Sequence, residues 1–211
     1  MTRPTRTNPR RVRLAFLLAV GVLLSLAACT PPPPRAHVLD QQNIGLQQNM
    51  SARVDAYVCN SQLWNLEVAQ SFTAGISGML DQVSLVAWKY PSAGSLDVAI
   101  HPLGSDGLPG STALGDGSYS GPQSSTTQTF LDIPLAHPAR VVAGTKYAIV
   151  VTTPVAVDCP SGTIYGWNLF GSSDTYPGGR VWQRGTITNA PDWQWTLGSN
   201  DLYFRTWVAP R

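Results

Sequence analysis

The sequence predicts an all-β fold, an antiparallel two-sheet β-sandwich of jelly-roll type that follows a cleaved N-terminal signal. Short runs of β-branched and aromatic residues alternate between apolar and polar positions, as strands with one buried face do. The 19 glycines and 17 prolines separate these runs as turns. After the N-terminal segment, no stretch sustains the 3.6-residue periodicity of a helix. An up-and-down barrel built from the same strands is the alternative.

Residues 1–28 have the composition of an export signal. Five arginines and no acidic residue occupy residues 1–13, and residues 14–28 are all apolar or small. A helix needs about 20 residues to span a bilayer, so this apolar run is short for a stable span. A basic start, a short apolar centre and small residues at the end are typical of a signal peptide.

The end of the run, Leu26-Ala27-Ala28-Cys29, resembles the lipobox of bacterial lipoproteins. The resemblance implies cleavage before Cys29, a diacylglyceryl group on its thiol, and a fatty acid such as palmitate on the new amine. An ordinary signal peptide with a chance cysteine, or an uncleaved anchor helix, are the alternatives. The four prolines at 31–34 then predict an extended polyproline spacer.

The expected domain organisation has three parts. Residues 1–28 are the signal peptide, residues 29–50 are the lipidated cysteine and a tether rich in proline and glutamine, and residues 51–211 are the β-sandwich. The tether is expected to contain a first strand near residues 37–42. The strands expected after it are residues 66–74, 80–89, 95–103, 127–135, 146–153, 163–170, 180–187, 192–197 and 201–208.

Alternation within these runs predicts which side chains face the core. In the run at 95–103, Asp97 and His101 are expected to face solvent. Gln70 shares a strand face with two apolar residues, so its amide is expected to be hydrogen-bonded if that face is buried. The apolar residues expected to line one face of their strands are Val68, Phe72, Val83, Leu85, Ala87, Leu96, Val98, Ile100, Leu131, Ile133 and Leu135.

Charge and cysteine content bear on the partners and the compartment. Five of the 14 basic residues lie in the leader, so residues 29–211 carry nine basic and 12 acidic residues, a net charge of −3. The sequence therefore shows no basic patch that would argue for nucleic acid, and we expect no nucleic-acid partner. With Cys29 assigned to lipid, Cys59 and Cys159 are expected to form a disulfide outside the cytosol. A reactive thiol pair, or half of a metal site, is the alternative.

Three segments carry a resemblance to a known group of domains. AQSFTAGISGMLDQVSL (69–85), HPARVVAGTKYAIVV (137–151) and DLYFRTWV (201–208) resemble extracellular bacterial β-sandwich domains of the "choice-of-anchor" kind. The resemblance covers about residues 66–208 and implies a jelly-roll module delivered to a cell surface. It implies no catalytic residues.

Few residues in the sequence can support catalysis. Glu67 is the sole glutamate, there are three histidines, and no GxSxG, HExxH, Walker or zinc-type motif occurs. We therefore expect no enzyme activity and no cofactor. A hydrolase built from aspartates distant in sequence is an alternative, as is a structural calcium held by Asp106 and Asp116 around the loop at 104–110.

Tryptophan is concentrated near the C-terminus, where five of the seven tryptophans follow residue 160. Trp193 and Trp195 are two residues apart and so share a face on a strand. Together with Trp182, and with Tyr176 exposed in a turn, they are the candidate ligand-binding residues, because aromatic rings stack on sugars. The alternative is that these rings fill the core. The neighbouring residues expected to hydrogen-bond sugar hydroxyls are Arg184, Asn189, Asp192 and Gln194.

These features predict a lipid-anchored, extracytoplasmic protein of the bacterial cell envelope. Its partners are expected to be the membrane, through the anchor, and a glycan or another envelope component bound by a non-catalytic surface module. The alternative is a structural or assembly protein that contacts another protein of the envelope.

Overall fold

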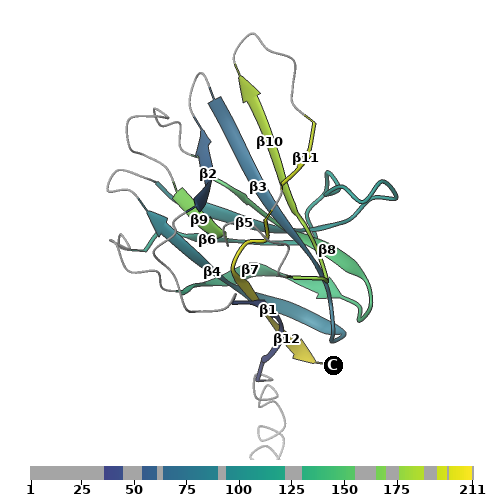
Figure 1. The fold of residues 1–211 in the computed structure, drawn as a ribbon. Coiled ribbons are helices and arrows are strands. Elements are labelled where there is room, and N and C mark those ends of the chain that lie inside the picture. The colour runs from purple at the N-terminus through teal and green to yellow at the C-terminus, as the bar shows by residue number, and fades with distance from the viewer. Residues whose placement is uncertain are drawn as a thin grey trace, which may run out of the picture. The chain divides into compact units, whose positions relative to one another are not determined.

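The computed structural model describes residues 36–44, 54–60, 64–89, 94–121, 130–154, 165–169, 176–187, 194–198 and 200–210, and in them every regular element is a β-strand (Figure 1). No helix in these residues has the length and apolar character that a membrane span needs. The strands are β1 (Val38–Asn43), β2 (Val54–Asn60), β3 (Trp64–Thr73), β4 (Gly78–Lys89), β5 (Leu96–Pro102), β6 (Gly115–Tyr119), β7 (Phe130–Val141), β8 (Lys146–Thr152), β9 (Tyr165–Leu169), β10 (Val181–Ile187), β11 (Thr196–Leu197) and β12 (Phe204–Pro210).

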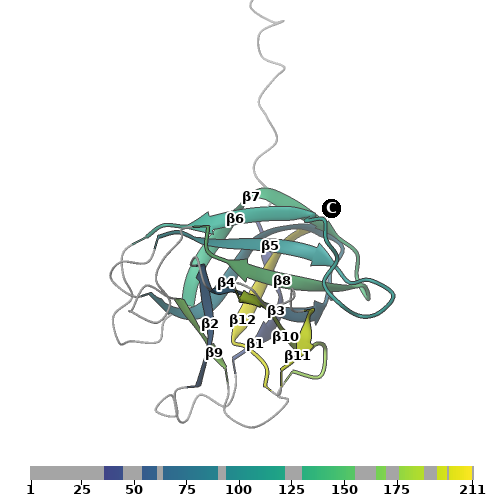
Figure 2. The ribbon, with the colours of Figure 1, turned by 90° about the horizontal axis from the view of Figure 1, so that it is seen from above.

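The strands form one antiparallel sheet that curls around a single core. Ten strands follow the order β1-β12-β4-β7-β6-β5-β8-β3-β10-β11. The remaining two make a second connection, because β2 pairs with β3 and β9, and β9 pairs with the end of β4. Figure 2 shows β7, β6, β5 and β8 side by side, with β3 and β10 continuing the curl. The predicted all-β antiparallel class is confirmed.

Strands β6 and β7 lie close together but have a single paired position, Asp116 with His137. Glycines allow the two strands to approach there. A Cβ on Gly115 would lie 2.4 Å from the carbonyl oxygen of His137, and a Cβ on Gly117 would lie 2.4 Å from that of Pro134. The sequence Gly-Asp-Gly resembles a turn, so sequence reasoning missed β6. In this strand the glycines allow the backbones of β6 and β7 to lie close together.

The core is built from the inward faces of the strands, as alternation predicted. Every second residue is buried in β5 and, apart from His137, in β7, whereas all residues from Tyr147 to Val151 of β8 are buried. The expected inward positions of β3 and β4 are buried as well. Asp97 and His101 are partly exposed on the other face of β5. The largest rings of this core are Trp167, Phe72 and Phe204, and Trp167 is 1% exposed with its Nε1 donating to the carbonyl of Tyr203 at 2.8 Å.

All nine strand ranges expected after the tether contain an observed strand, and the first strand expected near residues 37–42 is β1. It pairs with β12 from Val38 opposite Val208 to Asn43 opposite Phe204. The sequence did not predict β2, which carries Cys59 opposite Leu66 of β3. Cys29 and Cys159 lie outside the described residues, so lipidation and the disulfide remain predictions.

Candidate functional site

The outward side chains at the centre of β3, β8 and β5 are small. Ala69 of β3 pairs with Val150 of β8, and Val150 pairs with Ala99 of β5. Ala69, Ala148 and Val150 form a small buried cluster separate from the main core. Because these side chains are short, larger residues around them enclose a depression on the outer face of the sheet.

A cleft of about 590 Å³ lies over this part of the sheet, with Val150 and Ala99 among its lining residues. Strand pairing places polar residues of neighbouring strands opposite one another in this cleft. Glu67 of β3 is opposite Arg184 of β10, and Asp97 of β5 is opposite Thr152 of β8. The polar side chains that line the cleft are Glu67, Asp97, His101, Ser111, Asp116, Ser118, Thr152 and Arg184.

Two predicted ligand-binding residues share this face. Trp182 of β10 pairs with Ala69, and Trp195 lies just before β11, which pairs with β10. Both indoles are partly buried and pack against the cluster of small residues. Trp195 lines the cleft itself. The structure therefore brings Trp182 and Trp195 together from two segments of the chain.

Arg184 fixes the position of Trp195. Its guanidinium carbon lies 4.6 Å from the centroid of the indole, and its Nε donates to Oε2 of Glu67 at 3.2 Å. A cation–π contact of this kind contributes about 0.5–1 kcal/mol at an exposed site. The contacts run from Glu67 through Arg184 to Trp195 and so hold one wall of the cleft in place.

The cleft carries more negative than positive charge. Three carboxylates line it, on Glu67, Asp97 and Asp116, against the single guanidinium of Arg184. Glu67 pairs with Arg184, and Asp116 Oδ1 lies 3.0 Å from His137 Nδ1 on the exposed side of β6. Within the described part of the chain, Asp97 has no hydrogen-bonding partner. Among the three carboxylates, that of Asp97 is the one for which no described residue is a partner.

The prediction that Tyr176 is exposed was wrong, because its side chain is 8% exposed. Its hydroxyl donates to Gln41 Oε1 at 2.9 Å, and its ring meets Phe204 edge-on at 5.1 Å. The glycines after it allow the turn to lie directly on β3, since a Cβ on Gly179 would be 1.7 Å from the carbonyl oxygen of Ser71. A turn pressed against the sheet buries the residue that sequence reasoning placed in solvent.

The buried amide of Gln70 is fully hydrogen-bonded, as predicted. Its Nε2 donates to Asp201 Oδ1 at 3.0 Å and its Oε1 accepts from the backbone N–H of Leu202 at 2.8 Å. Asp201 is itself buried, and its Oδ2 accepts from the backbone N–H of Tyr176 at 2.8 Å. This network anchors β12 and the turn at 176–179 to β3, so Gln70 and Tyr176 are structural residues.

Burial raises the pKa of Tyr176 to about 12, and the charges of Asp40 and Asp201 add to the rise against an opposing backbone hydrogen bond. The folded state therefore favours the protonated phenol. The stability this gives is complete below the unfolded pKa of about 10 and is lost as the pH rises through about 12.

We expect the free energy of unfolding to fall more steeply between pH 10 and 12 in the wild type than in Tyr176→Phe, by at most about 1.4 kcal/mol per pH unit. Urea unfolding at pH 8, 10 and 11 measures the difference, and the pH 8 data account for the hydrogen bond to Gln41 that the variant loses. Parallel curves for the two proteins above pH 10 would contradict this assignment.

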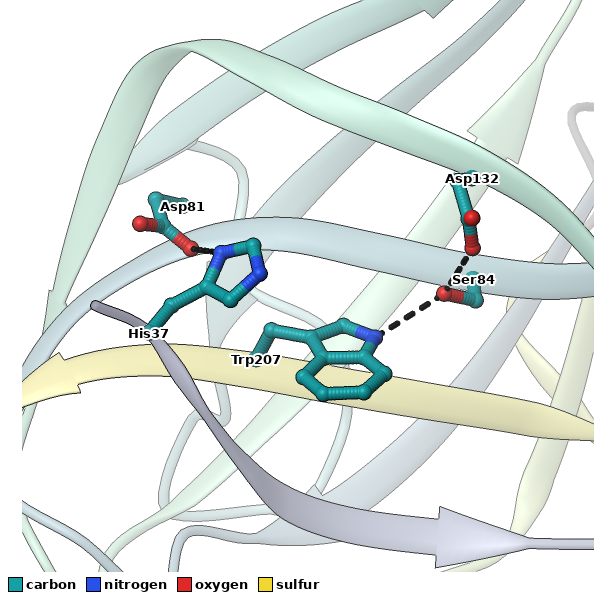
Figure 3. Close-up of polar contacts among 5 residues, drawn as sticks. All are labelled: His37, Asp81, Ser84, Asp132 and Trp207. Carbon is teal, nitrogen blue, oxygen red and sulfur yellow. Dashed lines mark hydrogen bonds and ion pairs between the residues drawn. The ribbon is translucent and has the colours of Figure 1, made fainter.

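A second group of polar residues lies outside the cleft, on the outer face of β4, β7 and β12 (Figure 3). Ser84 Oγ donates to Asp132 Oδ1 at 2.6 Å and accepts from Trp207 Nε1 at 3.0 Å, while His37 Nδ1 lies 3.1 Å from Asp81 Oδ1. A serine nucleophile needs a hydrogen bond to its base. Here the histidine packs on the ring of Trp207 at 5.3 Å, and Ser84 is fully buried. The arrangement fastens β1 to β12 and β4 and lacks the contact that catalysis requires.

The aspartates considered for calcium belong to different local structures. Asp106 Oδ1 accepts from the backbone N–H of Leu108 within its own loop, whereas Asp116 faces His137. No group of three or more His, Cys, Asp or Glu side chains in the described ranges is placed to hold a metal ion.

The carboxylates of the cleft were not predicted as a site. Sequence reasoning placed Asp97 and His101 on an outward face but had no means of pairing them with Glu67 and Asp116, which come from other strands. In the sequence, these cleft residues share one feature: each is a polar residue at an outward position of a strand. Of the predicted ligand contacts, Asn189, Asp192 and Trp193 lie outside the described residues, and Gln194 is exposed.

Neither the scan against protein-family models nor the search of curated proteins gave a match for this chain. The function must therefore be argued from the cleft itself.

Proposed function

We propose that the β domain is a non-catalytic glycan-binding module of a lipid-anchored protein of the bacterial cell envelope. The observation that supports it best is the cleft on the outer face of β3, β5 and β8, with Trp195 on one wall and carboxylates on its floor and rim. Ligand sites are concave and combine apolar surface with a few placed polar groups. This cleft has both.

A sugar chain suits the two kinds of surface in the cleft. The C–H faces of a pyranose pack on indole rings and on short aliphatic side chains, which Trp195, Ala99 and Val150 supply. The hydroxyls of a sugar donate to carboxylates, and Asp97 is the carboxylate without a partner among the described residues. Because Arg184 and Glu67 hold Trp195 in place, little conformational entropy is lost when a ligand binds.

The cellular location in this proposal rests on the N-terminal sequence. The lipobox-like Leu26-Ala27-Ala28-Cys29 supplies the anchor, and β1 begins at Val38, so residues 30–37 connect the two. The finer fold assignment is a two-layer jelly roll. The thin pairing between β6 and β7 supports it, because it divides β1-β12-β4-β7 from the strands that carry the cleft. A Cys59–Cys159 disulfide would fit the extracytoplasmic location.

Replacing Trp195 with alanine is expected to weaken binding of an oligosaccharide by about tenfold to a hundredfold, because buried aromatic anchors dominate such interfaces. The ligand is first selected on an array of envelope polysaccharides, and affinity is then measured by calorimetry. Trp207→Ala is the matched control, since Trp207 is partly buried on the outer face of β12. Wild-type affinity in Trp195→Ala, or no binding to any polysaccharide, would count against the proposal.

A second candidate is a glycoside hydrolase, favoured by the three carboxylates in one cleft. Such enzymes use two carboxyl groups that act as acid and as base or nucleophile. Among the described residues, Arg184 engages Glu67 and His137 engages Asp116, whereas Asp97 has no partner, so we favour binding over hydrolysis. Release of new reducing ends from the bound glycan by the wild type, and its absence in Asp97→Asn, would establish the hydrolase instead.

A further inference from the structure

A second cleft, of about 380 Å³, lies further along the same outer face. Strand β8 links the two clefts. Side chains alternate along a strand, so Lys146, Ala148, Val150 and Thr152 point to one face. Lys146 lines the second cleft, whereas Val150 and Thr152 line the first. Thr152 is six positions after Lys146 on the strand, which corresponds to about 20 Å.

The charge reverses between the two clefts. The second cleft is lined by the exposed cations Lys146 and Arg180 and by one carboxylate, that of Asp106. Asp106 Oδ1 already accepts from the backbone N–H of Leu108 at 3.0 Å. The local charge is therefore positive here and negative around Asp97, on one continuous face of the sheet.

The walls of the second cleft are held in place by the backbone. In the loop after β5, Gly104 N–H donates to Leu108 at 2.8 Å, Gly107 has a positive φ of 78°, and Leu103 bridges to Pro109. On the opposite wall, the backbone N–H of Arg180 donates to Ser71 Oγ at 2.7 Å. A preformed concave site with two cations is suited to an anion.

Trp182 forms the boundary between the clefts and carries a buried donor. Its indole lines the second cleft and also packs on the apolar cluster of Ala69, Ala148 and Val150. Its Nε1 is buried, and no described residue accepts a hydrogen bond from it.

From these features we infer that the second cleft binds an acidic group, a carboxylate or a phosphate, carried by the same glycan that occupies the first cleft. This rests on the proposed function. Guanidinium and ammonium groups bind such anions through charge-assisted hydrogen bonds. The neutral, hydroxyl-rich part of the chain lies over Val150 towards Asp97, and the acidic substituent lies at Lys146 and Arg180. The ligand is an acidic oligosaccharide long enough to span about 20 Å.

Calorimetry on the full chain in detergent tests this with three probes of similar length: an oligogalacturonate, a phosphomannan fragment and a neutral oligosaccharide. At least one acidic probe is expected to bind more tightly than the neutral one. Arg180→Ala combined with Lys146→Ala is expected to weaken that binding by about tenfold or more and to reduce its salt dependence, with neutral binding unchanged. Tighter binding of the oligogalacturonate would identify the acidic group as a carboxylate, and tighter binding of the phosphomannan fragment would identify it as a phosphate.

The matched control is Arg140→Ala compared with Arg180→Ala, because Arg140 is an exposed arginine on β7, outside both clefts. Equal losses in these two variants, or no preference for an acidic probe, would overturn the inference. So would unchanged acidic binding in the double variant. If neutral binding still depends on Trp195 in those cases, the first cleft keeps its proposed function. If the wild type binds neither the neutral probe nor the acidic probes, both proposals are wrong.

Discussion

Replacing Cys29 with serine is expected to abolish attachment of lipid to the protein and leave residues 1–28 in place. In the proposed anchor, the thiol of Cys29 accepts a diacylglyceryl group and cleavage then occurs just before that residue. Each buried CH₂ contributes about 0.8 kcal/mol, and two chains hold a protein stably where one chain holds it marginally. Metabolic labelling with a fatty-acid analogue and the mass of the purified protein measure both effects.

Cys59→Ser is the control for this experiment, because it removes a different thiol from the same chain and should retain the label. Its backbone lies in β2, opposite Leu66. A labelled Cys29→Ser protein, or a wild-type protein that retains Met1, would refute the lipid anchor and remove the basis for the envelope location.

Replacing Gln70 with leucine is expected to lower the free energy of unfolding by about 3–5 kcal/mol. Leucine has nearly the same volume, so the loss is specific to hydrogen bonds. It would leave the backbone N–H of Leu202 without an acceptor and remove a donor from Asp201, in a site where Gln70 and Asp201 are almost completely buried. Urea unfolding followed by tryptophan fluorescence gives the difference in stability.

Gln183→Leu makes the same substitution at an exposed position of β10, and its effect is expected to stay within about 0.5 kcal/mol. The urea dependence of the free energy should be the same in both variants, since neither changes the surface exposed on unfolding. A Gln70→Leu protein within about 1 kcal/mol of the wild type would show that the network contributes little to the fold.

The strands and their inward faces were predictable because each depends on a local pattern. Alternation in β5 and β7 put Ile100 and Ile133 in the core, where both are fully buried. β2 shows the same alternation, with Val54, Ala56 and Val58 two residues apart, so this strand was equally predictable from the sequence. β6 lacked it, because close contact with β7 requires glycine.

The site was less predictable because it depends on which strands become neighbours. Glu67, Asp97 and Asp116 come from β3, β5 and β6. They share one face because β6 pairs with β5, β5 with β8, and β8 with β3. The aromatic signal did identify Trp182 and Trp195. It failed for Tyr176, where burial depends on how a turn packs against a strand that lies far away in the sequence.

We propose that the outer face around Trp195 and Trp182 is the ligand-binding surface. Its most direct test is a two-dimensional NMR spectrum of the indole N–H groups, recorded with and without a glycan that the protein binds. Each signal is assigned by single tryptophan substitutions. The signals of Trp195 and Trp182 are expected to shift, while those of Trp167 in the core and Trp207 on the outer face of β12 stay in place. Shifts confined to Trp207, with Trp195 and Trp182 unchanged, would contradict the account.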